Sequence, residues 1–167
     1  MERIVGTPYV RSMRIAIASD HAAFVLKREL AAWLRETGHE VVDLGSDNED
    51  RVDYPDYGYF LADALARGEA ERGVALCGSG IGISIAANRH PAVRCALVSE
   101  PLSARLAREH NDANAIALGA RLISSDMAKA CVEAFLATEF AGANDPTSRH
   151  RGRVEKLAHP PLTGVPT

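Results

Sequence analysis

A cysteine followed by a glycine-rich stretch is the part of the chain best suited to chemistry. Cys77 ends a short apolar run, and residues 78–82 after it read Gly-Ser-Gly-Ile-Gly. Glycines let a backbone approach a ligand closely, and a helix that begins after them directs free N–H groups toward negative charge. The same setting favours the thiolate form of a cysteine, which is a usable nucleophile or base. The stretch therefore indicates an anion-stabilising loop with a thiol at its edge.

The spacing of these glycines differs from three well-known loops. It is not the dinucleotide-binding fingerprint, and the first predicted strand–helix turn of the chain contains no glycine. It is not a P-loop, since no Gly-Lys-Ser/Thr follows. Ser79 is not in a nucleophile elbow, because Cys77 stands where that motif needs glycine. On spacing alone, the stretch could equally be an ordinary tight turn between a strand and a helix.

Two clusters that contain histidine are the other candidates for chemistry. Residues 19–21 read Ser-Asp-His, and residues 110–112 read His-Asn-Asp. For either histidine taken alone, a structural or surface role competes with a catalytic one. The acidic stretch over 43–56 lacks the pattern of a calcium loop, so we expect a solvated surface there. Cys95 and Cys131 are expected to be buried packing residues.

The elements that must position these residues follow from alternating apolar and amphipathic segments. The pattern predicts strands over 15–18, 40–44, 74–77, 95–98 and 115–118. It predicts helices over 22–37, 57–66, 101–110 and 125–139, and one more from the glycine stretch to about residue 88. Five strand-then-helix units with short connections predict an α/β protein with a five-stranded parallel sheet covered by helices on both faces.

Details of the first helix can also be predicted. Asp20 is placed to cap it and Gly38 to end it, while Lys27 lies off its apolar stripe.

Ligands of open parallel sheets bind beyond the carboxyl ends of the strands. Residues 19–21 and the loop after Cys77 both follow such ends, so we expect the site at that edge of the sheet.

The composition excludes several classes of protein. The chain has 167 residues, 47% of them hydrophobic and 25% charged, which is typical of a globular domain. A net charge of −3, from 19 basic and 22 acidic residues, argues against a broadly basic nucleic-acid binder. No apolar run reaches the length of a membrane span. Three widely spaced cysteines suggest neither a disulfide framework nor a metal knuckle, and a reducing cytoplasm is the simplest location.

The two ends of the chain depart from the alternating pattern. Residues 1–12 are interpreted as an N-terminal extension without the apolar core of a signal peptide. Residues 13–157 are expected to form the functional domain, and 158–167 a C-terminal tail. From 141 onward the chain is rich in proline and carries a basic cluster over 149–153. This region is expected to add little core, and to be disordered or to lie on another surface such as a partner subunit.

Together these motifs resemble the B-type ribose-5-phosphate isomerases, a family that includes allose- and galactose-6-phosphate isomerases. The resemblance runs from about Arg14 to Leu157. It is carried by Ser19-Asp20-His21, Asp53-Tyr54-Pro55, Cys77-Gly78-Ser79-Gly80-Ile81-Gly82-Ile83-Ser84-Ile85-Ala86-Ala87-Asn88, Ser99-Glu100-Pro101 and His110-Asn111-Asp112.

The resemblance implies an aldose–ketose isomerase that uses neither metal nor other cofactor and converts ribose 5-phosphate to ribulose 5-phosphate. Members of the family have a Rossmann-like three-layer α/β/α fold. They form dimers, or dimers of dimers, whose active sites are shared between subunits. One branch of the family has a glutamate at the position of Ile83. Because this chain has Cys77 and no acid at position 83, it resembles the cysteine branch.

The resemblance also implies roles for individual residues. Cys77 would be the general base, Ser79 and the N–H groups up to Gly82 would hold the cis-enediolate oxygens, and His110 would help to open the sugar ring. The sugar would contact Asp20, Tyr54, Asn111 and the loop residues Gly78, Gly80, Ile81 and Gly82. The phosphate would bind His21, Arg121, Arg149 and Arg153, some of them from the second subunit, and Arg151 could replace either of the last two arginines.

The sequence leaves three alternative functions open. The substrate could be a six-carbon aldose 6-phosphate, since the sequence does not give the pocket volume. Cys77 and His110 could instead serve a thiol hydrolase with a covalent intermediate. The chain could also be a module that binds a sugar phosphate without turning it over.

Overall fold

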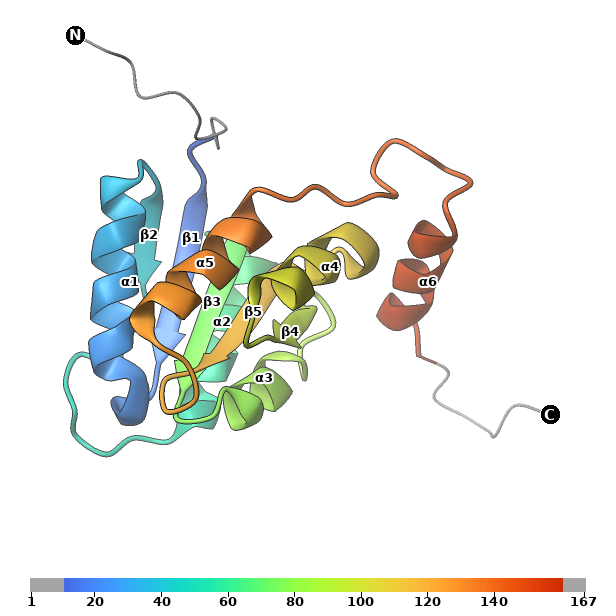
Figure 1. Ribbon diagram of the computed structural model, residues 1–167. Coiled ribbons are helices and arrows are strands. Elements are labelled where there is room, and N and C mark those ends of the chain that lie inside the picture. Colours follow the sequence, from blue (N-terminus) through green and yellow to red (C-terminus); the bar gives the residue numbers. More distant parts are fainter. Residues whose placement is uncertain (1–10, 161–167) are drawn as a thin grey trace, which may run out of the picture.

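The sheet of the protein has five strands, and every neighbouring pair is parallel. A computed structural model describes residues 11–160 (Figure 1). The strand order is β2-β1-β3-β5-β4, which confirms the predicted five-stranded parallel sheet. The strands are β1 (Arg14–Ser19), β2 (Glu40–Asp43), β3 (Arg72–Cys77), β4 (Cys95–Leu97) and β5 (Ala115–Gly119).

Helices cover both faces of this sheet. One face packs against α1, α4 and α5, and the other packs against α2 and α3, which gives three layers. The helices are η1 (His21–Ala23, a 3-10 turn), α1 (Phe24–Glu36), α2 (Tyr54–Ala66), α3 (Ile81–Ala87), α4 (Pro101–Asn111), α5 (Ser125–Leu136) and α6 (Arg149–Ala158). Within residues 11–160, no helix is both long and apolar enough to cross a membrane.

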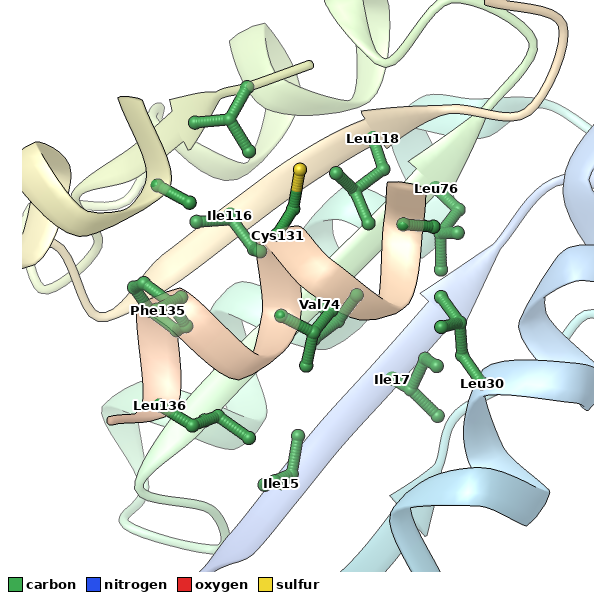
Figure 2. Close-up of a cluster of buried hydrophobic side chains, with 14 of the residues drawn as sticks. Ile15, Ile17, Leu30, Val74, Leu76, Ile116, Leu118, Cys131, Phe135 and Leu136 are labelled. Carbon is green, nitrogen blue, oxygen red and sulfur yellow. The ribbon is translucent and has the colours of Figure 1, made fainter. Parts of the chain in front are cut away.

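The two faces of the sheet differ in side-chain size. Successive residues of a strand point to opposite faces, and in the central strands bulky and small residues alternate. The bulky set packs against α1, α4 and α5 (Figure 2): Ile15, Ile17, Val74, Leu76, Ile116 and Leu118. The other face carries Ala18, Ala75, Cys77, Ala115 and Ala117 and packs against α2 and α3. Cys77 thus lies on the face with small side chains, directly before α3.

Local signals set the ends of the elements as predicted. The Asp20 carboxylate accepts hydrogen bonds from the N–H groups of Ala22 and Ala23, and so caps η1 just before α1. Gly38 has a φ of +94° after α1, a conformation that disfavours residues with a Cβ. Pro101 occupies the first turn of α4, where its missing N–H costs nothing. Several boundaries shift: α2 begins at 54 rather than 57, and α5 ends at 136 rather than 139.

The expected surface position of Lys27 is wrong, whereas the acidic side chains over 43–56 are exposed as predicted. Lys27 is only 1% exposed, and its Nζ lies 2.5 Å from Oδ1 of Asp43 at the end of β2. A buried ammonium needs a counter-ion, and the neighbouring strand supplies one. The pair therefore joins α1 to β2. The hydrophobic pattern of α1 could not reveal it, because the partner belongs to another element.

Helix α6 was not predicted and is the main difference from the expected fold. The region was expected to be disordered or to lie on another surface, but residues 149–158 form a helix, which lies beyond α4 in Figure 1. Its described residues include none that are buried, so the expectation of little core there is confirmed. The guanidinium of Arg151 fixes the helix by donating to the carbonyl oxygens of Gly142 and Ala143 at 2.9 Å.

Most of the predicted end segments lie outside the described residues. Of the predicted extension over 1–12, the structure describes Arg11, which pairs with Glu71, and Ser12, whose hydroxyl donates to the Gly38 carbonyl at 2.8 Å. Of the predicted tail over 158–167, it describes residues 158–160. The three-part division of the chain remains a prediction.

Candidate active site

The loop after β3 places backbone donors around the Cys77 thiol. The N–H of Gly80 donates to the Cys77 sulfur at 3.1 Å. Gly80 has a φ of +76°, which favours glycine, and this conformation turns the chain into α3. Next to it, the Ser79 hydroxyl accepts a hydrogen bond from the N–H of Ile81 at 3.2 Å. A nucleophilic sulfur and several N–H groups therefore meet within one turn of chain.

The end of β5 holds this loop in place. The N–H of Ala120 donates to the Cys77 carbonyl at 2.9 Å, and the N–H of Arg121 donates to the Gly78 carbonyl at 3.0 Å. Gly119, the last residue of β5, lies so close to the Cys77 loop that a Cβ built on it would be 2.6 Å from the Ser79 carbonyl oxygen. Only glycine fits there without moving the loop. This requirement could not be predicted from the sequence, because Gly119 lies in a different strand–helix unit.

Two long side chains flank the loop. The Tyr54 ring lies over Gly82, where a Cβ would be 2.5 Å from two ring carbons. The Arg121 guanidinium lies over Gly78, where a Cβ would be 3.1 Å from one of its nitrogens. Both side chains are exposed toward solvent. A phenol and a cation thus border the loop from opposite segments of the chain.

The turn after β1 lies beside this loop. Asp20 is 6% exposed, and its N–H donates to the carbonyl of Leu76, the residue before Cys77. The N–H of Val52 donates to Nδ1 of His21 at 3.2 Å, which leaves Nε2 of that ring for another partner. The predicted convergence of Asp20, His21 and the Cys77 loop at the carboxyl edge of the sheet is thus what the structure shows.

The other two cysteines lie in the core. Both are buried, as predicted. Burial raises the pKa of the Cys95 thiol to about 12. Burial, together with the nearby Glu100 carboxylate, raises the pKa of the Cys131 thiol to about 11. Both thiols therefore stay protonated at neutral pH, and Cys77 is the cysteine placed at the ligand-binding edge.

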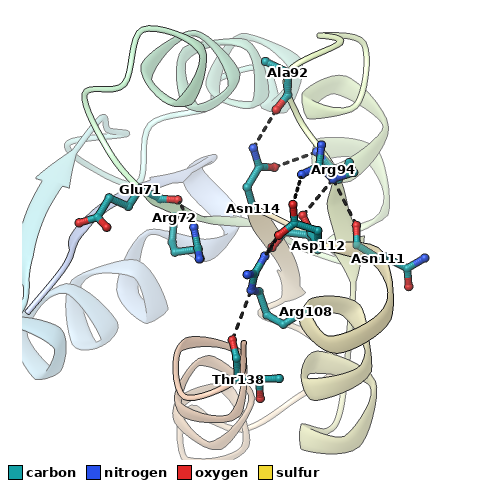
Figure 3. Close-up of polar contacts among 10 residues, drawn as sticks. Glu71, Arg72, Ala92, Arg94, Arg108, Asn111, Asp112, Asn114 and Thr138 are labelled. Atoms are coloured by element: carbon teal, nitrogen blue, oxygen red, sulfur yellow. Dashed lines mark hydrogen bonds and ion pairs between the residues drawn. The ribbon is translucent and has the colours of Figure 1, made fainter. Parts of the chain in front are cut away.

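His110 and Asn111 lie at the opposite edge of the sheet. They are the last two residues of α4, a helix that begins near the carboxyl end of β4 and returns toward the opposite edge of the sheet. There the guanidinium of Arg94, just before β4, donates to the Asn111 carbonyl at 3.2 Å and to the Asp112 carboxylate at 2.9 Å (Figure 3). One chain therefore does not bring His110 to its own Cys77.

Two arginines hold the end of α4 in place. Asp112 adopts a φ of +46°, which is uncommon outside glycine. Its second carboxylate oxygen lies 2.7 Å from the guanidinium of Arg108, which is 4% exposed. Figure 3 shows the carboxylate between Arg94 and Arg108. Sequence reasoning grouped Asp112 with the site, and the structure gives it this structural role.

Helix α6 places its basic residues beside His110. The imidazole rings of His110 and His150 are stacked, with centroids 4.4 Å apart and planes 5° from parallel. Arg149 and Arg153 are exposed on α6. Arg151 is occupied by the carbonyl oxygens of residues 142 and 143. The residues predicted to contact substrate thus form two groups, one at each edge of the sheet.

The described residues offer no metal site of the usual kind. Within residues 11–160, no group of three or more His, Cys, Asp or Glu side chains could hold a metal ion. Asn88, the last residue of the long glycine-rich motif, has a structural role instead. Its side chain donates to the Cys95 carbonyl and accepts from the Cys95 N–H, both at 2.8 Å, and so joins α3 to β4.

Comparison with known proteins agrees with the architecture and the motifs. The model of the Ribose/Galactose Isomerase family matches residues 15–157. Ribose-5-phosphate isomerase B of Escherichia coli is 44% identical over 144 residues, which cover 86% of this chain and 93% of that protein. The protein of the same name from Mycobacterium tuberculosis is 39% identical, covering 92% of this chain and 98% of its own length.

Solved structures give the same result. A ribose 5-phosphate isomerase from Thermotoga maritima superimposes with a TM-score of 0.84 at 45% identity, covering 89% of this chain and 99% of that one. Ribose-5-phosphate isomerase B of Clostridium thermocellum also gives a TM-score of 0.84, at 46% identity. This match covers 87% of the present chain and 95% of the Clostridium chain. The chain therefore belongs to the ribose/galactose isomerase family.

Proposed function

We propose that this protein is a sugar-phosphate isomerase that interconverts ribose 5-phosphate and ribulose 5-phosphate. The observation that carries the proposal is the Cys77 sulfur within a turn of backbone donors at the carboxyl edge of the sheet. The relatives from Escherichia coli and Mycobacterium tuberculosis, which are 44% and 39% identical to it over most of its length, are named ribose-5-phosphate isomerase B.

The chemistry of the reaction matches this loop. Cys77, as thiolate, takes the proton from C2 of the open-chain aldose, and the electron pair moves toward the C1 carbonyl oxygen. The resulting cis-enediolate concentrates negative charge on O1 and O2, where fixed donors stabilise it. The Ser79 hydroxyl and the N–H groups of residues 78–82 are those donors. Return of the proton from the thiol to C1, together with transfer of the O2 hydroxyl proton to O1, gives the ketose, so no redox cofactor is needed.

The phosphate and the ring-opening group come from both edges of the sheet. Arg121 and His21 border the Cys77 loop and hold the phosphate from one side. Arg149 and Arg153 complete the phosphate site, and His110 assists ring opening while Asn111 contacts the sugar. Because the second group lies at the far edge of its own sheet, we infer that it serves the Cys77 loop of another subunit.

The surface beside the loop supports a shared site. Ile81 and Ile85 on α3 are 50% and 55% exposed. Because they are four residues apart, they lie on the same face of that helix. Leu97 is 47% exposed, and its side chain would lie 2.8 Å from a Cβ built on Gly80. Leu102, at the start of α4, is another exposed apolar side chain, at 54%. An apolar patch that borders a catalytic loop is suited to a second copy of the chain, in a dimer or tetramer.

We also propose that the reaction takes place in the cytoplasm. Three cysteines are free and buried, as is usual in a reducing compartment. The thiol of Cys77 must also stay reduced to act as a base.

A panel of aldose phosphates tests the substrate. Purified protein, without added metal or nucleotide, is expected to isomerise ribose 5-phosphate with the highest kcat/KM of the panel. A higher value for allose 6-phosphate or galactose 6-phosphate would instead assign the protein to six-carbon sugars. Binding of ribose 5-phosphate without turnover, by folded protein, would contradict the proposed function.

A further inference from the structure

The His110 ring is held mainly by one neighbour. Its side chain is 41% exposed, and the nearest carboxylate oxygen, on Glu109, is 3.9 Å from Nε2, beyond hydrogen-bond distance. Within residues 11–160, the ring of His110 makes no hydrogen bond. The parallel ring of His150, 4.4 Å away between centroids, is therefore the contact that fixes its plane.

Burial and nearby charged groups act on the protonation of His150. Three charged groups face the two rings: Glu109 from α4, and Arg149 and Arg153 from α6. Desolvation lowers the pKa of His150 below its ordinary value, and His110 and the two arginines lower it further, against the opposing effect of Glu109. A neutral His150 stacks on His110 without repulsion between two positive rings.

We propose that His150 is a positioning residue for His110, holding its ring in the orientation that opens the sugar. This inference rests on the proposed function, in which His110 moves protons during ring opening. In that step the bond from C1 to the ring oxygen breaks, the ring oxygen gains a proton and the C1 hydroxyl loses one. An exposed side chain that is free to rotate would lose much of its rate advantage, because proton transfer needs fixed geometry.

The position of α6 does not rest on the stack alone. His150 lies in α6 next to Arg149, and the guanidinium of Arg151 in the same helix donates to the carbonyl oxygens of Gly142 and Ala143. Loss of the His150 ring is therefore expected to free the His110 ring while Arg149 and Arg153 stay in place.

The chemistry of the two sugars allows a selective test. Ribose 5-phosphate is largely a ring and must open before Cys77 can act. Ribulose 5-phosphate is open-chain, because its phosphate occupies the oxygen that would close a five-membered ring on C2. Exchange of its C1 proton with solvent therefore needs the Cys77 loop but no ring-opening step.

The experiment compares His150→Ala with His150→Phe. In His150→Ala, kcat for ribose 5-phosphate is expected to fall about tenfold, as expected when an aromatic contact that orients a proton-transfer group is lost. Exchange of the C1 proton of ribulose 5-phosphate in D2O should stay within about twofold of the wild-type rate. His150→Phe keeps a flat ring and should recover most of the lost kcat. His159→Ala, an exposed histidine at the end of α6, is the matched control.

Other outcomes have distinct meanings. An equal loss in both reactions would show that His150 only supports the fold and would overturn the inference, as would an unchanged kcat in His150→Ala. If the phenylalanine variant were as impaired as the alanine variant, the stack would not be the cause. Failure of the proposed function is separate, since the wild-type protein would then catalyse neither reaction.

Discussion

At the scale of single residues, the site depends on glycines that allow other groups to come close. Gly82 and Gly78 leave room for the Tyr54 ring and the Arg121 guanidinium. The sequence revealed these glycines because they are adjacent to Cys77. Gly119 is as important but isolated in sequence, and only the contact between the end of β5 and the Ser79 carbonyl shows its role.

The substitution Gly119→Ala should therefore damage activity more than stability. The added Cβ would lie 2.6 Å from the Ser79 carbonyl oxygen, so the loop must move, and its donors would no longer match the enediolate. We expect kcat to fall by about 10²-fold, as for the loss of an oxyanion donor. Steady-state kinetics and a thermal melt would measure the two effects. Full activity in this variant would mean that the loop position does not matter.

At the scale of elements, a buried ion pair joins α1 to β2. In Asp43→Asn the Lys27 ammonium, 1% exposed, would lose its counter-ion. We expect the free energy of unfolding to fall by about 3 kcal/mol, the low end for a broken buried pair, because the Asp43 side chain is 31% exposed. Urea denaturation would measure the loss.

The double variant Lys27→Met, Asp43→Asn is the control for that prediction. It removes the charge that the single variant leaves unpaired, so much of the lost stability should return. If the single and double variants were equally unstable, packing rather than charge would explain the effect.

The elements also show what sequence patterns could predict. Apolar runs that alternate with amphipathic segments predicted the sheet, and Asp20, Gly38 and Pro101 marked helix ends. The helix α6 was missed because it has no apolar stripe that packs into the core. Lys27 was misplaced because burial of a charge depends on a partner in another strand. Local patterns cannot report contacts between distant segments.

At the scale of the whole molecule, each chain carries the predicted site residues in two groups, at opposite edges of its sheet. Cys77, with Asp20 and Tyr54, lies at the carboxyl edge, and His110 lies beside α6 at the other. The sequence motifs predicted both groups as site residues but could not show that the groups lie apart. That separation is what makes a shared site the simplest arrangement in an assembly of identical subunits.

Mixed assemblies of two inactive variants test the shared site. Co-expressed Cys77→Ala and His110→Ala chains should regain about one quarter of the wild-type rate, because half of the dimers would be mixed and one of their two sites would be intact. Each variant alone should be close to inactive. If activity does not return although mixed dimers form, each site would have to be built from a single chain.

The most direct test of the account is the isomerisation of ribose 5-phosphate by the wild-type protein, Cys77→Ala and Cys95→Ala. Both variants remove one buried thiol, but only Cys77 lies at the ligand-binding edge, whereas the Cys95 pKa is about 12. We predict that Cys77→Ala lowers kcat by about 10³-fold and that Cys95→Ala keeps nearly full activity. A Cys77→Ala protein that isomerises ribose 5-phosphate at close to the wild-type rate would contradict the account.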